Sequence, residues 1–113
     1  MNSNNVISLP AVADLLPFRA VKATALGIDY AGAADKVIGF TLPGDLNRNH
    51  PTVQLHGSFI EAVLGDGTDI AAGDELEQFA GGTYIKKSAG TAVGVALAVA
   101  TIVGDRFNAV IHR

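Results

Sequence analysis

The first residues in this sequence that could carry chemistry are three histidines. His50, His56 and His112 are possible metal ligands, but their spacing matches no ligand pattern that a single helix or hairpin would bring together. The sequence contains no cysteine that could complete such a site. His56 and His112 each fall at the end of a predicted strand, where a structural role is favoured over metal binding.

A second candidate group is acidic and consists of Asp74, Glu75 and Glu77. Two carboxylates can act as a general acid and base when a pocket surrounds them. Asp74 follows a glycine, as Asp105 does, and a Gly-Asp pair is typical of turns. Glu75 and Glu77 flank Leu76, which is the alternation of a strand with one solvated face. The pattern therefore favours structural roles for these side chains.

The run of residues 65–69, GDGTD, has some features of a dinucleotide-binding loop and of a calcium loop. It departs from the first because Ile70 stands where a glycine is required, and from the second because the alternating ligands and the closing glutamate are missing. A hairpin turn is the favoured interpretation. Ser58 follows Gly57 but does not lie in a nucleophile elbow. We expect no enzymatic activity, no cofactor and no bound metal.

Composition limits the other classes of function. The 113 residues carry a net charge of −3, whereas nucleic-acid binding requires a basic surface. The first ten residues, MNSNNVISLP, lack the basic start of a signal peptide. The seventeen residues of the 88–104 stretch carry no charge, but they contain three glycines and fall short of the ~20 that a membrane helix needs. We expect a single domain of soluble type, with no nucleic-acid or membrane partner.

Short β-branched runs between glycine-rich turns predict an all-β fold, a small barrel or a sandwich. Residues 1–17 are predicted to be an extended N-terminal arm (1–9) followed by a short helical turn between Pro10 and Pro17, with Ala11, Leu15 and Leu16 facing inward. Residues 18–113 are predicted to form the β domain. Its predicted strands are 18–23, 27–30, 36–42, 52–56, 58–63, 75–79, 83–87, 91–98 and 106–112.

The β domain is predicted to be internally duplicated. An offset of 55 residues aligns the run 27–42 with 82–97 and places four identical residues at sixteen positions. After one inserted residue, the run 53–56 aligns with 109–112, and both runs end in histidine. We therefore expect two related units of about 55 residues, in which the uncharged run 91–97 is a buried strand equivalent to 37–42.

The second half of the chain resembles the decoration, or cement, proteins of tailed-phage capsids. The residues that carry the resemblance are Gly94-Val95-Ala96 followed by Gly104-Asp105, with the run 38–40 as a weaker first copy. The resemblance covers residues 18–113 and rests on a rhythm of common residues. It implies a small β protein that binds the outer surface of the mature shell, with the major capsid protein and other copies of itself as partners, a trimer being the expected homo-oligomer. It further implies that the protein is made in the host cytoplasm and resides in the virion.

Two segments outside the duplicated pattern are the predicted attachment elements. The arm is expected to contact the capsid through Asn4, Asn5, Val6, Ile7 and Leu9, and the polar loop 43–51 is expected to contact the capsid or another copy through Leu46, Asn47, Arg48, Asn49 and His50. A frayed terminus is the alternative for residues 1–9. Two other functions remain open: a small β-barrel that binds a ligand or metal, and a structural component of the head–tail junction or tail.

Overall fold

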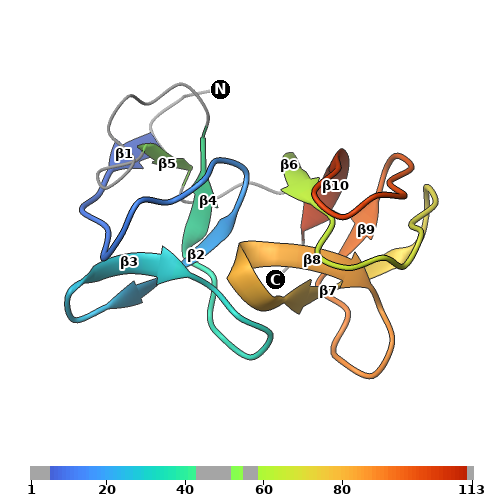
Figure 1. The fold of residues 1–113 in the computed structure, drawn as a ribbon, viewed down its shortest axis with the longest axis horizontal. Coiled ribbons are helices and arrows are strands. Elements are labelled where there is room, and N and C mark those ends of the chain that lie inside the picture. The colour runs from blue at the N-terminus through green and yellow to red at the C-terminus, as the bar shows by residue number, and fades with distance from the viewer. Residues whose placement is uncertain (1–5, 43–51, 55–58, 112–113) are drawn as a thin grey trace.

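The computed structural model describes residues 6–42, 52–54 and 59–111, and these residues form two five-stranded antiparallel sheets that lie side by side (Figure 1). The first sheet, in the spatial order β1-β5-β4-β2-β3, contains β1 (Val6–Ser8), β5 (Thr52–Gln54), β4 (Gly39–Thr41), β2 (Ala20–Thr24) and β3 (Gly27–Tyr30). The second, in the order β6-β10-β9-β7-β8, contains β6 (Phe59–Val63), β10 (Arg106–Ile111), β9 (Gly94–Ala96), β7 (Glu75–Phe79) and β8 (Thr83–Lys86). The prediction of an all-β fold is confirmed. Neither sheet closes into a barrel within the described strands.

The two sheets are copies of one topology, as the sequence offset predicted. Raising each strand number of the first sheet by five gives the order of the second. The register repeats as well: the pair Val21–Gly39 recurs 55 residues later as the pair Leu76–Gly94. On the other side of the central strand, the pairing of residues 41 and 53 recurs as that of residues 96 and 109. We call residues 6–54 unit 1 and residues 59–111 unit 2.

A glycine at the start of the central strand is required in both units because the neighbouring strand lies against it. A Cβ atom added to Gly39 would meet the backbone carbonyl of Gln54 and would lie 2.8 Å from Val53 Cγ1. A Cβ atom added to Gly94 would meet the carbonyl of Val110 and would lie 2.7 Å from Ile111 Cδ1. Gln54 and Val110 are equivalent residues, so the same backbone approach fixes glycine twice.

Equivalent positions also form the centres of the two units. In unit 1, Leu15, Val21 and Val53 are buried in a small cluster of their own. Their counterparts in unit 2 are Ile70, Leu76 and Ala109, which are buried in the larger cluster of the molecule. Each unit therefore places apolar side chains at the same points of the same topology.

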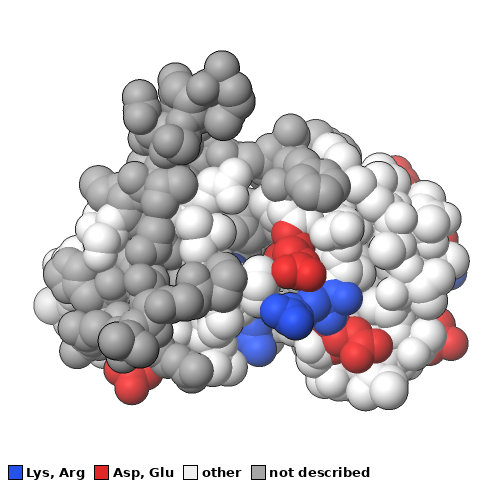
Figure 2. Space-filling model, turned by 90° about the horizontal axis from the view of Figure 1, so that it is seen from above, with Lys and Arg blue, Asp and Glu red and all other residues white. Residues whose placement is uncertain are grey.

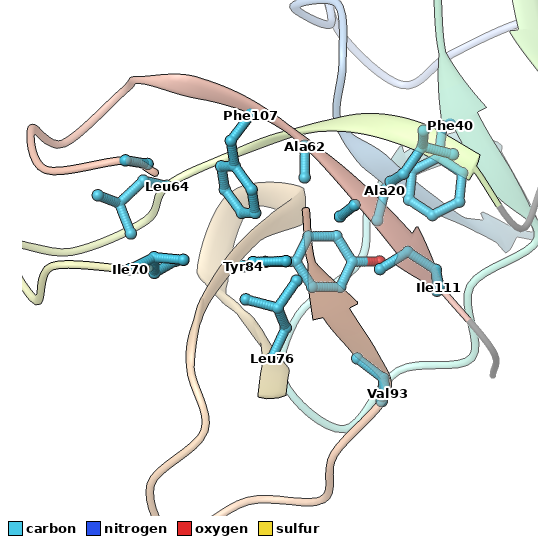
Figure 3. Packing of buried hydrophobic residues seen from close by; sticks show 14 of the residues in the cluster. Ala20, Phe40, Ala62, Leu64, Ile70, Leu76, Tyr84, Val93, Phe107 and Ile111 are labelled. Carbon is cyan, nitrogen blue, oxygen red and sulfur yellow. The ribbon is translucent and has the colours of Figure 1, made fainter. Parts of the chain in front are cut away.

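The larger cluster extends across the interface between the units, because Ala20, Ala31 and Phe40 of unit 1 belong to it. The ring of Phe40 lies against that of Tyr84, with 6.2 Å between centroids (Figure 3). Hydrogen bonds also join the two units: Gly82 N donates to the Ala31 carbonyl at 3.0 Å. The side chain of Gln78 donates to the carbonyls of residues 32 and 35, at 2.8 and 2.9 Å. The two units therefore form one domain.

The surface of unit 1 that meets unit 2 has a different chemistry from its counterpart on unit 2. Ala20 and Ala31 are buried at this inter-unit interface. The residues 55 positions later are Glu75 and Lys86, and both are exposed. Lys86 also lies 3.8 Å from a carboxylate oxygen of Asp74. The apolar interface of unit 1 is therefore replaced in unit 2 by a charged, solvated surface.

The predicted helical turn between Pro10 and Pro17 is wrong, because the only helix in the described part of the chain is the 3-10 turn η1 (Ala80–Gly82). Ala11 instead forms a parallel bridge with Ile28, whose N–H donates to the Pro10 carbonyl at 2.9 Å and whose carbonyl accepts from Val12 N at 3.0 Å. These bonds hold the segment extended. Leu15 is buried as predicted, whereas Leu16 is exposed and its N–H donates to the Tyr30 hydroxyl.

Part of the predicted arm also belongs to the fold. Val6–Ser8 is β1, which pairs antiparallel with β5 and is the counterpart of β6 in unit 2. Leu9 is half-buried and packs against the small cluster of unit 1. Unit 1 therefore begins within residues 1–17.

Candidate functional site

The structure describes few of the residues that were predicted to make contacts. Val6 and Ile7 lie in β1, and Leu9 follows it. Asn4 and Asn5, the loop residues Leu46, Asn47, Arg48, Asn49 and His50, and the histidines at 56 and 112 lie outside the described residues. Contact of the arm and of the 43–51 loop with a shell stays a prediction.

A cavity of about 290 Å³ lies where the two units meet. The described residues that line it are Phe18, Phe40, Thr41, Leu42 and Gln54 of unit 1 and Ile60, Glu61 and Asn108 of unit 2. Half of these residues are apolar and half are polar or charged, and the volume lies just below the range of about 300–1,000 Å³ that is usual for small-molecule sites. Only a small ligand with both apolar and polar groups would fit the cavity.

Phe18, on the wall of this cavity, has an unusual backbone conformation. Its φ angle is +62°, and among the described residues it is the one non-glycine with a positive φ. Its counterpart in unit 2 is Gly73, with a φ angle of +93°. The N–H of Phe18 donates to the carbonyl of residue 41, and the N–H of Gly73 donates to the equivalent carbonyl of residue 96, both at 2.8 Å. The fold therefore requires a left-handed residue here, which costs a phenylalanine about 1–2 kcal/mol.

The side chain of Phe18 makes a contact that a glycine at this position could not make, and this contact offsets part of the backbone cost. The guanidinium carbon of Arg106 lies 4.8 Å from the centroid of the Phe18 ring, a cation–π contact between the two units. Such contacts stabilise by about 0.5–1 kcal/mol at exposed sites. Sequence reasoning missed Phe18 because the signal lies in comparing residues 18 and 73, which precede the aligned part of the two units.

Asp74 and Glu77, two of the three acidic residues considered for catalysis, hold loops in place, and so does Asp105. Asp74 Oδ2 accepts a hydrogen bond from Ala71 N at 2.8 Å. Asp105 Oδ2 accepts bonds from the N–H groups of Thr101 and Ile102, at 3.2 and 3.0 Å. Glu77 Oε1 accepts from the N–H groups of residues 88 and 90, at 2.6 and 3.0 Å. The interpretation of the Gly-Asp pairs as turns is confirmed.

A second cavity, of about 340 Å³, also lies between the units and is lined by Asp35 and Glu77 among others. Asp35 Oδ2 accepts from Gly32 N at 2.7 Å and from Lys22 Nζ at 3.0 Å. The hydrogen bond from the Gly32 N–H, followed by that from Lys22, lowers the pKa of Asp35 below its usual value. Both carboxylates are bonded to backbone N–H groups, so the cavity offers no free acid–base pair among the described residues.

Two buried side-chain polar atoms have no hydrogen-bond partner among the described residues: Arg19 Nε and the hydroxyl oxygen of Tyr84. The hydroxyl of Tyr84 is sealed in the larger cluster, where Figure 3 shows its oxygen among apolar side chains. Burial raises the pKa of this phenol well above its usual range, because the phenolate would lose its hydration. No reacting group lies beside it in the cluster, so Tyr84 contributes packing.

The most exposed apolar surface lies on the connection between β9 and β10. Four of the seven large exposed hydrophobic residues among those described are here: Leu97, Val99, Ile102 and Val103, with exposed fractions of 46, 64, 67 and 60%. We call residues 97–103 the apolar loop. It projects from unit 2 on the side away from unit 1 (Figure 1), and unit 2 is mostly uncharged on the face shown in Figure 2. Sequence reasoning treated part of this segment as buried strand.

Other kinds of site find little support in the described residues. They contain no group of three or more potential metal ligands and no helix long and apolar enough to span a bilayer. No protein-family model matches the chain, and no curated protein sequence is significantly similar to it.

Proposed function

We propose that this chain is a capsid decoration, or cement, protein that binds the outer surface of a phage shell and stabilises contacts between major capsid subunits. The observation that carries the proposal is where the resembling residues lie in the fold. Gly94-Val95-Ala96 is the central strand β9, and Gly104-Asp105 is the turn that leads into β10. The weaker first copy includes the equivalent strand, β4.

The physical form of the molecule supports this role. A protein that braces other subunits requires contact area, about 800 Å² per partner in a stable interface, and requires no enclosed active site. β1 is at the end of the strand order of the first sheet, and an edge strand can pair with a strand of a partner. Assembly as a homo-oligomer, with a trimer as the expected form, multiplies such contacts through avidity.

The proposal is tested by mixing the purified chain with empty, expanded shells of the phage whose genome carries its gene. We expect image reconstruction to show added density at regular positions on the outer surface, and decorated shells to resist heating better than bare shells. Shells without added density would contradict the proposal. Density confined to the portal vertex would instead favour a head–tail component.

The cavity beside Phe18 favours a second candidate, a module that binds a small ligand. The chain would then respond in a thermal-shift screen against common metabolites and divalent metals. A ligand that raises the melting temperature of the wild-type chain, but not that of a Leu42→Arg variant with a blocked cavity, would support this function over decoration.

A further inference from the structure

We infer that the apolar loop of unit 2 is a second attachment element, which docks into an apolar groove on the shell protein bordered by lysine or arginine. This inference rests on the proposed decoration function. It assigns the contact to residues 97–103, which lie outside both segments that the sequence indicated.

The first support is the direction in which the side chains of the loop point. The small residues Ala98 and Ala100 face the larger cluster, whereas the branched residues Leu97, Val99 and Ile102 face solvent. A loop whose only role was to connect two strands would gain more stability from the opposite arrangement, because burial of a larger apolar side chain stabilises more. An exposed group of large apolar side chains marks an interaction surface.

The second support is that hydrogen bonds fix the loop at several points. Ala100 exchanges both backbone hydrogen bonds with Ile70, at 2.8 and 3.1 Å. The Asp105 carboxylate binds the N–H groups of Thr101 and Ile102, and Leu97 N donates to the Asn108 carbonyl at 2.8 Å. A loop held in one conformation loses little entropy on binding, so the exposed side chains are preorganised for a partner.

The third support is topological. The apolar loop joins β9 to β10, and the predicted contact loop 43–51 joins β4 to β5, so the two connect equivalent strands. The duplication therefore provides one loop at this position in each unit, the first polar in sequence and the second without any charge.

Charge decides which occupant fits. Asp105, two residues after the loop, binds the N–H groups of Thr101 and Ile102, and Asp66 and Asp69 precede Ile70, the bridge partner of the loop. The guanidinium of Arg106 lies over the Phe18 ring instead. A second copy presenting the same loop would bring these carboxylates together, and an anionic membrane would repel them. An apolar groove with basic borders is complementary to the loop in both hydrophobicity and charge.

The size of the loop fits a partner that is an assembly. Four exposed side chains provide much less than the ~800 Å² that a stable pair of proteins buries on each side. A contact of this size is useful when many copies bind one shell, or when the arm and the 43–51 loop bind simultaneously.

The test compares three forms of the full chain in co-sedimentation with the empty shells: wild type, the double variant Val99→Ser/Ile102→Ser, and Leu26→Ser. Leu26 is the matched control because it is 86% exposed and lies outside the apolar loop, in the β2–β3 turn of unit 1. We expect the double variant to bind about a hundredfold more weakly, since each buried aliphatic side chain contributes about tenfold. Leu26→Ser is expected to bind like wild type, and all three are expected to have the same circular dichroism spectrum.

The outcomes separate this inference from the proposed function. Equal binding by wild type and the double variant would overturn the loop assignment and leave the decoration function standing. Absence of binding by wild type itself would overturn both. Loop-dependent binding to vesicles of phosphatidylcholine and phosphatidylserine, or an oligomer in native mass spectrometry that the double variant loses, would assign the loop to a membrane or to a second copy and would also overturn the inference.

Discussion

The glycines at the start of the two central strands allow a quantitative test of the duplicated fold. In Gly94→Ala the new methyl group would meet the Val110 carbonyl and lie 2.7 Å from Ile111 Cδ1. Both atoms belong to β10, which is paired with β9 and cannot move away without breaking that pairing. Overpacking of this kind costs about 1–3 kcal/mol, and contact with backbone places the effect at the upper end, about 3 kcal/mol. Gly39→Ala should cost a similar amount, because the Gln54 carbonyl occupies the equivalent place.

This loss of about 3 kcal/mol in folding stability would be large for a domain of this size, whose total stability is about 5–15 kcal/mol. It corresponds to a fall in melting temperature of roughly 10 °C. The assay is urea unfolding followed by circular dichroism, with Gly67→Ala as the control. A Cβ atom at Gly67 meets nothing within 4 Å, so this substitution should change stability by less than about 0.5 kcal/mol. If Gly94→Ala and Gly67→Ala were equally stable, the close approach of strands described for both units would be refuted.

Three further predictions concern side chains. Tyr84→Phe should stabilise the fold by about 1 kcal/mol, because it removes a buried hydroxyl without a partner among the described residues. Tyr30→Phe should destabilise the fold by about 1 kcal/mol, because the Tyr30 hydroxyl accepts a hydrogen bond from a backbone N–H. Changes of opposite sign in the free energy of urea unfolding would confirm the contrast, and changes of equal sign would contradict it. Asp35 has a lowered pKa, so its contribution is present above the unfolded-state value of about 4 and is lost as the pH falls through the folded-state pKa. Asp35→Asn should therefore narrow the difference in urea midpoint between pH 7 and pH 3, and an unchanged difference would count against the role of this carboxylate. Ala31→Lys, which places the residue of the equivalent position in unit 2 at the buried interface, should cost about 3 kcal/mol or more in the same assay, and retention of wild-type stability would show that the interface is not closed.

The strands and the duplication were predictable because their signals are local. In the run 75–79, Leu76 stands between Glu75 and Glu77, and the resulting strand has the predicted bounds. Glycine is required at residues 39 and 94 by the same close approach of a neighbouring strand. A sequence alignment that superposes these two glycines therefore also superposes the two units. By contrast, Pro10 and Pro17 were interpreted as the limits of a helical turn, and tertiary hydrogen bonds to Ile28 keep this segment extended.

The candidate site was less predictable because its signals are not local. An uncharged run such as 97–103 has the same composition whether it is buried in a sheet or exposed for a partner. The direction of Val99 and Ile102 is set by the bridge between Ala100 and Ile70, residues 30 positions apart. The conformation of Phe18 likewise became informative only when the structure placed it at the position of Gly73.

The charged surface of unit 2 at Glu75 and Lys86 limits how far this architecture can be extended. A gene carrying a third tandem unit would encode a chain in which that unit must bury a carboxylate and an ammonium group to dock as unit 2 docks on unit 1. Repeat proteins end their arrays with polar outer surfaces for the same physical reason. The same two charged side chains disfavour end-to-end joining of separate copies of the chain through this surface, because burial of unpaired charges is costly.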